Sequence, residues 1–381
     1  MKHLARAALL FCVLIVGLAH AHKPSDSYLS LDTTREDARI AGQWDIALRD
    51  LDHAIGVDID GDGAVTWGEL RRREQDIVRF AFAHLAIRQV GRNTRDVCPL
   101  QFDRLLADSH VDGMYAVLRF HADCAAVPAE IAIDYSLLFD VDPAHRGLLE
   151  LHTQGGDQAG VLSPNDSHLT FALNSTDPGK QLRYFVAEGV WHILHGYDHL
   201  LFLFTLLLPA VVMYRDGRWE PRPSLRDAVL DILKTVTAFT LAHSVTLSAA
   251  ALGAVTLPSR VVESAIALTV VLGALNNLFP VVTQRRWLVA LVFGLIHGFG
   301  FASVLSDLGL QRANLAVALF GFNVGVELGQ LAVVLVLAPL IYVLRESVLY
   351  RRVFMPAGAI AISVVALYWF VARAFGVGGS F

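Results

Sequence analysis

Six long apolar segments fill the second half of the chain and constrain its fold more than any other feature. They cover residues 184–214, 227–253, 260–281, 287–307, 312–345 and 351–376. An α-helix needs roughly 20 apolar residues to cross the hydrocarbon core of a bilayer. The segments therefore predict a polytopic bundle of six transmembrane helices over residues 184–376, with the lipid bilayer as its partner. A hydrophobic content of 54% agrees with this prediction.

Arginines between the segments predict the orientation of the bundle. They follow the first, third and fifth segments: Arg215, Arg218, Arg222, Arg226, Arg285, Arg286, Arg345, Arg351 and Arg352. The intervening loops carry little beyond Arg260 and Arg312. Because arginine-rich loops face the cytoplasm, we expect a bacterial inner-membrane protein whose N-terminal domain is periplasmic. A net charge of -5 gives no indication of a nucleic-acid partner.

The first 21 residues have the pattern of a secretory signal peptide. Lys2 and Arg6 precede an apolar core at 7–18, and Ala19-His20-Ala21 resembles a cleavage site. A short anchoring helix is the alternative. After cleavage His22 would offer an α-amine and an imidazole, a copper-chelating pair if a second histidine approached. The candidates for that second histidine are His84, His110, His121 and His152.

Residues 22–180 are polar and mixed, which predicts an exported α+β domain. Apolar residues alternate over Ile131–Phe139 and, more weakly, over three further runs, which predicts a small antiparallel β-sheet or sandwich. The weaker runs are Tyr115–His121, Leu148–His152 and Leu169–Leu173, and helical spacing occurs at Trp44–Ile55 and Leu70–Ile87. In an oxidising compartment we expect a disulfide between Cys98 and Cys124, with two buried thiols as the alternative.

A twelve-residue segment of the exported domain, residues 58–69, matches the calcium-binding loop of an EF-hand. Carboxylates stand at positions 1, 3, 5 and 12, a glycine at position 6 and an apolar residue at position 8. The predicted Ca²⁺ ligands are Asp58, Asp60, Asp62, the Ala64 carbonyl, Thr66 and bidentate Glu69. A solvated acidic turn is the alternative. Since a single loop is visible, a structural clamp is favoured over a signalling switch.

The first apolar segment contains four ionisable residues where water is scarce: His192, His195, Asp198 and His199. On one continuous helix the three histidines fall within roughly 60° of arc, and Glu188 joins the same face one turn earlier. Such residues inside a membrane need mutual compensation or a metal ion. We therefore predict a transition-metal site near the outer end of this helix.

Other apolar segments also carry polar residues, which extends the predicted site. These are His243, Glu263, His297 and Glu327 as further metal ligands, with Asn323 and Gln330 as supporting groups. Their depths suggest a descending path toward the bilayer centre. Glycines around His297 and around Glu327 would let those two helices approach closely. The alternative for each residue is a helix-to-helix hydrogen bond, and for Gln330 that reading is favoured.

The ligand types discriminate among metals. Imidazole and carboxylate suit Ni²⁺, Co²⁺, Zn²⁺ or Fe²⁺. The predicted bundle has no cysteine, and its two methionines, Met213 and Met355, lie near cytoplasmic helix ends. A Cu(I) pathway is therefore disfavoured.

The motif His192-x-x-x-Gly196-x-Asp198-His199 resembles the signature of the HupE/UreJ family of membrane proteins. Similar motifs are Ala242-His243-Ser244, Val262-Glu263-Ser264, Gly294-Leu-Ile-His297-Gly298 and Asn323-x-Gly325-x-Glu327. The resemblance implies uptake of nickel or cobalt for hydrogenases and ureases. Ile193 stands where the family has proline, and His195 is an additional imidazole.

Three functions compete at this point. The leading hypothesis is a divalent-metal permease in which the outer cluster captures the ion and His243, Glu263, His297 and Glu327 relay it inward. The second is an intramembrane metalloenzyme in which Glu263 or Glu327 acts as the base. The third is a receptor or assembly role with the bundle as an anchor. The sequence leaves protein partners open, a homo-oligomer among them.

Overall fold

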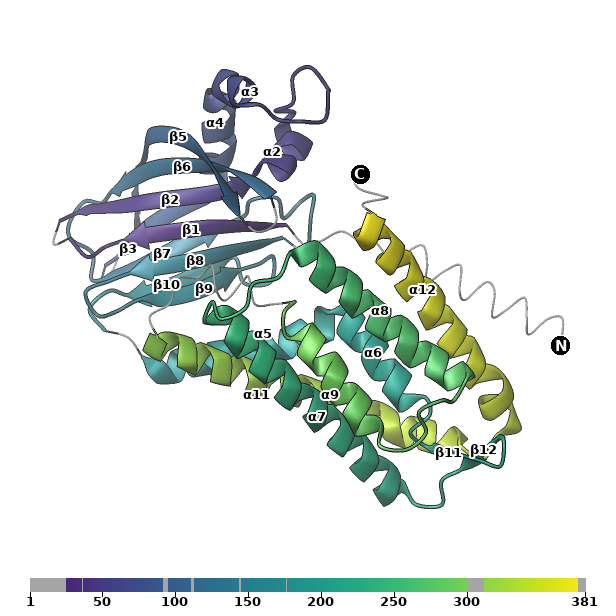
Figure 1. The fold of residues 1–381 in the computed structure, drawn as a ribbon. Coiled ribbons are helices and arrows are strands. Elements are labelled where there is room, and N and C mark those ends of the chain that lie inside the picture. Colours follow the sequence, from purple (N-terminus) through teal and green to yellow (C-terminus); the bar gives the residue numbers. More distant parts are fainter. Residues whose placement is uncertain are drawn as a thin grey trace. The chain divides into compact units, whose positions relative to one another are not determined.

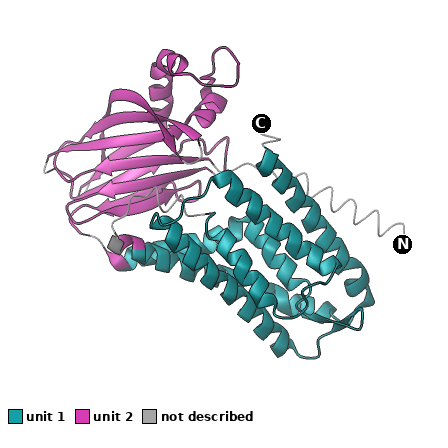
Figure 2. Cartoon of the chain, in the orientation of Figure 1, with its two compact units in different colours: residues 1–22, 179–303, 316–381 teal, residues 23–178, 304–315 magenta. Residues whose placement is uncertain are grey.

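The computed structural model describes residues 25–35, 37–91, 95–110, 113–143, 145–175, 177–300 and 312–375. The chain forms two compact units (Figure 2), residues 23–178 with 304–315 and residues 179–303 with 316–381. We call them the β-unit and the helical unit. The expected signal peptide, residues 1–21, and His22 lie outside the described residues.

The β-unit contains two sheets (Figure 1). The larger has the order β5-β6-β2-β1-β8-β9 and the smaller the order β10-β7-β3-β4. The strands are β1 Asp26–Asp32, β2 Arg39–Ala47, β3 Leu85–Val90, β4 Arg95–Cys98, β5 Leu100–His110, β6 Gly113–Asp123, β7 Glu130–Tyr135, β8 Arg146–His152, β9 Gln158–Leu162 and β10 His168–Ala172. Buried side chains of both sheets share one core, which includes Leu31, Trp44, Phe120, Ile87 and Ile133.

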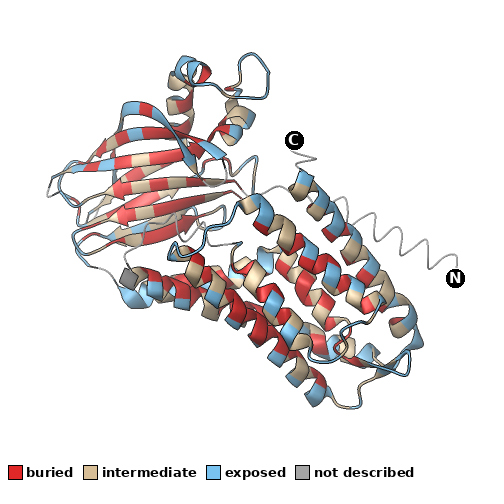
Figure 3. Ribbon diagram, in the orientation of Figure 1, coloured by how far each residue is buried: buried red, intermediate tan, exposed pale blue. Residues whose placement is uncertain are grey.

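Alternating burial along the strands explains this arrangement (Figure 3). In β1 every second residue is buried, so one face of the strand packs into the core. β1 pairs in parallel with β8, with Asp26 opposite Arg146 and Asp32 opposite His152, whereas its pairing with β2 is antiparallel. The expectation of a purely antiparallel sheet is therefore wrong at this one pair, because the chain reaches β8 by a crossover from the other sheet.

Three helices, α2 Leu48–Ile55, α3 Trp67–Arg72 and α4 Glu74–Ala83, connect β2 to β3. The helix expected over Trp44–Ile55 begins only at Leu48, because residues Trp44–Ala47 form the end of strand β2. Likewise Leu85–Ile87 belongs to β3 rather than to a helix. In both places a buried strand end adjoins a helix. The apolar residues of the two elements together have the spacing of one longer helix.

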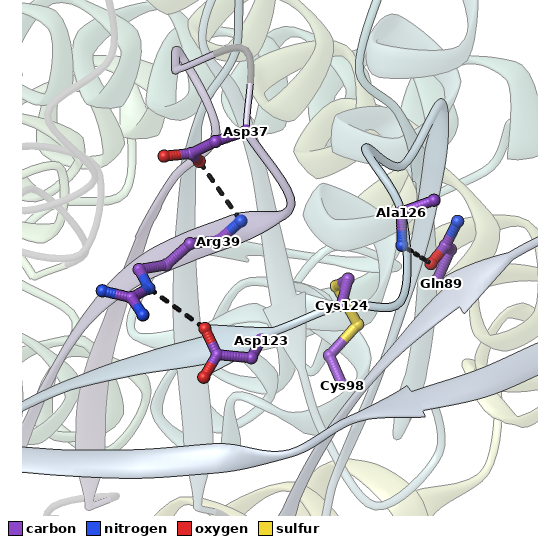
Figure 4. Close-up of a disulfide and its surroundings, with 7 residues drawn as sticks. All are labelled: Asp37, Arg39, Gln89, Cys98, Asp123, Cys124 and Ala126. Atoms are coloured by element: carbon purple, nitrogen blue, oxygen red, sulfur yellow. Dashed lines mark hydrogen bonds and ion pairs between the residues drawn. A yellow bond between two sulfur atoms is a disulfide. The ribbon is translucent and has the colours of Figure 1, made fainter.

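A disulfide between Cys98 and Cys124 connects the two sheets (Figure 4). Cys98 ends β4 of the smaller sheet, and Cys124 follows β6 of the larger. Both cysteines are buried in the common core. Nearby, the Ala126 N–H donates to Gln89 Oε1 at 3.2 Å, and Arg39 Nε donates to Asp123 Oδ1 at 3.0 Å. These contacts fasten the chain on both sides of the disulfide.

The helical unit contains helices long and apolar enough to cross a membrane. Four meet that description among the described residues: 225–251, 259–278, 314–344 and 350–375. The unit comprises α5 Pro178–His195, α6 Tyr197–Leu207, the hairpin β11 Val212–Arg215 and β12 Arg218–Pro221, α7 Leu225–Ala251, α8 Ser259–Leu278, α9 Arg286–His297, α11 Arg312–Leu344, the π-helical turn η1 Tyr350–Phe354 and α12 Met355–Phe375. In Figure 1, α8 runs along α12, and α7 along α9.

Two expected spans differ from the structure. The segment 184–214 is not one helix, because it breaks between α5 and α6 and ends in the β11–β12 hairpin. The segment 287–307 contains α9, which ends at His297, and residues 301–311 lie outside the described part of the chain. Both α6 and α9 are shorter than a full membrane crossing.

Glycines set two close helix contacts in this unit. A Cβ on Gly325 of α11 would lie 2.1 Å from the Val186 carbonyl of α5, and one on Gly294 of α9 would lie 2.3 Å from the Phe239 carbonyl of α7. The two glycine rows thus bring α11 to α5 and α9 to α7. The expectation that they join the helices of His297 and Glu327 is wrong, because a row of small residues permits close packing without selecting a partner.

Candidate metal centre

Gly196 breaks the first apolar segment and shapes the candidate site. Its N–H still donates to the His192 carbonyl at 2.9 Å, but its ψ of 93° ends the helix there. A Cβ at this position would lie 2.6 Å from the His192 carbonyl oxygen and 3.0 Å from His199 Nδ1. Only glycine leaves room for this turn. α6 therefore starts in a new direction, and His199 turns back toward His192.

Three histidines from three helices converge beside this break. His192 of α5, His199 of α6 and His243 of α7 each offer a ring nitrogen, and the three nitrogens lie within 4.8 Å of one another. Both His199 and His243 are buried. An ion bound at ~2.1 Å by imidazoles holds neighbouring nitrogens roughly 3.4 Å apart. Modest side-chain rotations would therefore bring the three nitrogens around one divalent ion.

Asp198 orients His199 rather than joining the three nitrogens. Its Oδ1 accepts a hydrogen bond from the His199 backbone N–H at 2.9 Å and lies 3.1 Å from His199 Nδ1. A carboxylate accepts only, so Nδ1 carries the proton and Nε2 keeps its lone pair. His199 Nε2 is buried and has no hydrogen-bond partner in the described part of the chain. A carboxylate behind a histidine in this way is the usual second contact of a metal-binding imidazole.

Asn323 of α11 orients His243 by the same logic. The Asn323 Nδ2 donates to the Leu319 carbonyl at 2.8 Å, which turns its Oδ1 toward His243 Nδ1 at 3.4 Å. His243 Nδ1 is then the donor, and Nε2 keeps the lone pair. That Nε2 is also buried without a hydrogen-bond partner among the described residues. Two of the three imidazoles are thus held in the tautomer that a metal ion needs.

A fourth imidazole, His297 at the end of α9, adjoins the three. Its ring centroid is 5.2 Å from that of His199, and the side chain is 1% exposed. His297 Nε2 is 2.8 Å from the Thr269 hydroxyl of α8, whereas Nδ1 has no partner in the described residues. We call His192, His199, His243 and His297 the histidine cluster.

The other expected ligands, His195, Glu263 and Glu327, have contacts with residues outside the histidine cluster. His195 is exposed, and its Nδ1 is 3.2 Å from the Trp191 carbonyl. Glu263 Oε2 is 3.9 Å from Arg373 Nε, so a cation from α12 compensates it. Glu327 accepts a hydrogen bond from the Thr237 hydroxyl at 2.6 Å. None of these three contacts involves the cluster.

Three threonine hydroxyls that bind the polar residues of this unit were not among the expected site residues. Thr237 and Thr240 of α7 bind Glu327 and Gln330 of α11, the latter at 2.9 Å, and Thr269 binds His297. Thr237 and Thr240 lie at steps of three residues before His243 on α7. That spacing is the signal that could have found them, since residues three apart share a helix face.

In the loop 58–69 of the β-unit, backbone N–H groups donate to the acidic side chains. The Gly61 and Gly63 N–H groups each donate to an Asp58 oxygen at 2.8 Å, and the Ile59 N–H donates to Glu69 Oε1 at 2.8 Å. One oxygen from each of Asp58, Asp60 and Glu69 lies within 4.8 Å of the others. These hard oxygen donors on a tight loop fit Ca²⁺.

Two of the expected calcium ligands have further contacts. Asp62 Oδ1 accepts from the Ala64 N–H at 2.8 Å. Thr66 is the N-cap of α3 and forms a capping box with Glu69, whose Oε2 accepts from the Thr66 hydroxyl at 2.7 Å. These Thr66 hydrogen bonds, with one from the Ile59 N–H, lower the pKa of Glu69 to about 2. The Glu69 carboxylate is therefore ionised well below neutral pH.

Comparison with known families agrees with the motifs around the histidine cluster. Residues 169–373, more than half of the chain, match the model of a family described as HupE / UreJ protein. The matched range contains all four cluster histidines and excludes the calcium-type loop. No curated protein matches the chain. The chain is a membrane protein that belongs to the HupE/UreJ family.

Proposed function

We propose that the helical unit is a permease for a divalent transition-metal ion, which binds at His192, His199 and His243. One observation carries the proposal: three imidazole nitrogens from three helices meet within 4.8 Å inside an apolar bundle. Asp198 and Asn323 hold two of the rings with their lone pairs available. His297 is the adjacent group that would receive the ion next.

The chemistry of the ligands supports nickel or cobalt as cargo, with zinc or iron as alternatives. Neutral imidazoles suit these ions, and the helical unit contains no cysteine that would favour Cu(I). The association of the HupE/UreJ family with nickel and cobalt transport supports the same cargo. Imidazole ligands must be deprotonated to bind, so capture would weaken in acid.

The proposed topology has six spans. The four long helices would cross the bilayer directly, α5 with α6 would form a broken crossing, and α9 would belong to the sixth. Broken spans are tolerated where the backbone is buried in protein. The arginine-rich loops support a cytoplasmic position for the β11–β12 hairpin and hence a periplasmic β-unit.

In this proposal the β-unit holds one calcium ion in loop 58–69. Asp58, Asp60, Asp62, the Ala64 carbonyl, Thr66 and Glu69 are the residues that would hold it. Bound calcium would supply charge neutralisation between α2 and α3. Support comes from the converging carboxylates and from the left-handed backbone at Gly61 and Gly63, with φ of 72° and 84°.

Metal uptake by substituted proteins tests the permease. Cells or proteoliposomes containing His199→Ala or Asp198→Ala should accumulate far less nickel than those containing the native protein, because each change removes a ligand or its orienting carboxylate. His195→Ala is the matched control, since His195 belongs to the same segment but is exposed, with its Nδ1 3.2 Å from the Trp191 carbonyl. Normal uptake by both His199→Ala and Asp198→Ala would refute the proposal.

The metalloenzyme alternative needs a carboxylate base beside the metal. Glu263 is compensated by Arg373, and Glu327 is bound to Thr237, so neither contact places a base at the cluster. The two functions also differ in metal retention. An enzyme would purify with a stoichiometric, slowly exchanging ion, whereas the permease should exchange its ion readily.

A further inference from the structure

A cavity of about 170 Å³ lies between α6, α8 and α9 of the helical unit. Its wall includes Phe202, Thr205, Asn277, Arg286, Val289 and Phe293. This volume is large enough to hold several water molecules. The proposed metal site does not use this cavity.

Aromatic side chains separate the cavity from the histidine cluster. Phe202 lines the cavity, and its ring centroid is also 5.5 Å from that of His297. Phe293 lines the cavity beside it, with 5.8 Å between the two phenyl centroids. Phe239 covers the cluster from α7, at 5.1 Å from His297 and 5.0 Å from Phe202. Phe202 thus contacts the cluster on one side and the cavity on the other.

Side-chain hydrogen bonds hold the backbone next to Phe202, so the side chain is the part of this residue that we expect to move. The Phe202 carbonyl accepts a hydrogen bond from the Thr205 hydroxyl at 2.6 Å, and the Thr205 carbonyl accepts one from Asn277 Nδ2 at 2.8 Å. α6 is thereby tied to α8 just beyond the ring. The cavity, by contrast, gives the ring space to rotate away from His297.

We propose that Phe202 is the gate of the transport path and that the cavity behind it is the exit chamber. This inference rests on the proposed permease. A phenyl ring has no atom that can coordinate a metal cation. In its closed position the Phe202 ring therefore blocks an ion that has lost its hydration shell, as apolar constrictions do in channels. When the ring rotates, the ion leaves imidazole ligands for a space in which water can solvate it.

The composition of the chamber favours release over retention. Most of its lining residues are apolar; of the polar ones, Thr205, Asn276 and Asn277 are uncharged, and Arg286 carries a positive charge. Arg286 begins α9, and its Nη1 donates to the Pro209 carbonyl at 3.2 Å. A cation in the chamber therefore meets weak ligands and a repelling charge. An ion that binds first to the imidazoles of the cluster and then only weakly in the chamber can leave the protein.

The test measures nickel binding and nickel flux on the same purified protein in proteoliposomes. Phe202→Ala should raise downhill Ni²⁺ flux by at least about fivefold, the rate change that corresponds to ~1 kcal/mol of barrier, with binding affinity retained. Phe202→Trp should abolish flux and retain binding. Unchanged flux in both variants, with binding intact, overturns the gate.

A second pair of variants keeps the test decisive if changes at Phe202 disturb His297. Val289→Phe adds a ring to the chamber from α9, whereas Val292→Phe adds the same ring one turn later, at an exposed position outside the chamber wall. Flux should fall several-fold only in Val289→Phe. Equal flux in the two variants contradicts the exit chamber. Failure of the permease itself is distinguishable, since the native protein would then show no flux that depends on His199.

Discussion

The imidazole rings of His192 and His199 lie with their centroids 4.7 Å apart although the residues belong to different helices. On a straight helix seven residues would separate them by ~10.5 Å along the axis. The break at Gly196 removes most of that separation. Capture of an ion by both rings therefore depends on a backbone turn as much as on the histidines.

Gly196→Ala tests this dependence. The added methyl group would lie 2.6 Å from the His192 carbonyl and 3.0 Å from His199 Nδ1, so the turn must shift and the two rings must separate. We expect a loss of nickel affinity and a stability cost of about 1–3 kcal/mol. Isothermal titration and thermal unfolding measure the two effects. Gly358→Ala is the control, because its methyl group would come no closer than 3.3 Å to the flexible Leu208 side chain.

Asp198→Asn separates the charge of Asp198 from its shape. The amide retains the size of the carboxylate but no longer supports the basicity of His199, whose Nδ1 is 3.1 Å away. We expect nickel affinity to fall by about 10- to 100-fold, as for other residues behind a metal-bound histidine. Equilibrium dialysis of the purified protein measures this fall. An affinity equal to that of the native protein would mean that Asp198 has no part in orienting the imidazole.

Hydropathy and polar residues predicted the membrane character and named all four histidines of the cluster, because ionisable side chains are rare in lipid. They did not predict which residues meet. Glu263 lies near Arg373 and Glu327 accepts a hydrogen bond from Thr237, and such pairing between helices depends on packing angles that a single segment does not encode. His192 and His195 keep their helical spacing on α5, whereas the break at Gly196 places His199 on a different helix, α6.

In the β-unit, periodicity predicted four of the strands but missed β1 and β2 at the centre of the larger sheet. β2 ends in four consecutive buried residues, Trp44–Ala47, and it continues into α2 without a turn. Alternation is lost there, so the strand reads as part of a helix. The calcium-type loop remains a prediction from the sequence, one that was possible because its expected ligand positions are local in sequence.

A buried polar network gives the β-unit a pH dependence. His145 is fully buried, with Nδ1 paired to the Ser25 hydroxyl and Nε2 2.6 Å from the Tyr135 hydroxyl. The Tyr135 hydroxyl is 2.7 Å from the Ser27 Oγ, which also accepts a hydrogen bond from Trp44 Nε1 at 3.1 Å. Burial lowers the pKa of His145 to about 4. The network therefore holds a neutral imidazole between β1, β2 and β7.

Acidification should loosen this network. Because the folded pKa lies below the unfolded value of 6.5, the stability is present above pH 6.5 and is lost as the pH falls toward 4. At pH 5 the loss amounts to about 2 kcal/mol. Hydrogen exchange of the β1 amides in the full-length protein, corrected for intrinsic rates, should show it. His145→Gln should remove the pH dependence, and a native protein with equal protection at pH 7 and pH 5 would contradict the prediction.

The disulfide should stabilise the β-unit through its unfolded state. Cys98 and Cys124 are 26 residues apart, and closing a loop of that length contributes about 3.5 kcal/mol by the chain-entropy relation. Cys98→Ser with Cys124→Ser should lower the denaturant midpoint of the full-length protein accordingly. Dithiothreitol should lower the midpoint of the native protein and leave that of the double variant unchanged. Insensitivity of the native protein to reduction would argue against a contribution from this bond.

Calcium should raise the thermal midpoint of the full-length protein through loop 58–69. Binding to the folded state alone stabilises it by about 2.7 kcal/mol when calcium is a hundredfold above its dissociation constant. Glu69→Gln removes one charge and one ligand oxygen, so the shift in midpoint should disappear. Glu74→Gln is the matched control, because Glu74 is five residues away and pairs with Arg71 at 2.9 Å outside the loop.

Terbium luminescence gives the calcium prediction an independent measurement. Trp67 is half exposed and lies within the loop, two residues before Glu69, so excitation of its indole should sensitise a Tb³⁺ ion bound there. Calcium should displace the terbium and quench the signal. Trp67→Leu should lose the luminescence yet keep the calcium-dependent midpoint, whereas Glu69→Gln should lose both. If calcium leaves the thermal midpoint of the native protein unchanged and no terbium signal is seen, residues 58–69 are a solvated turn.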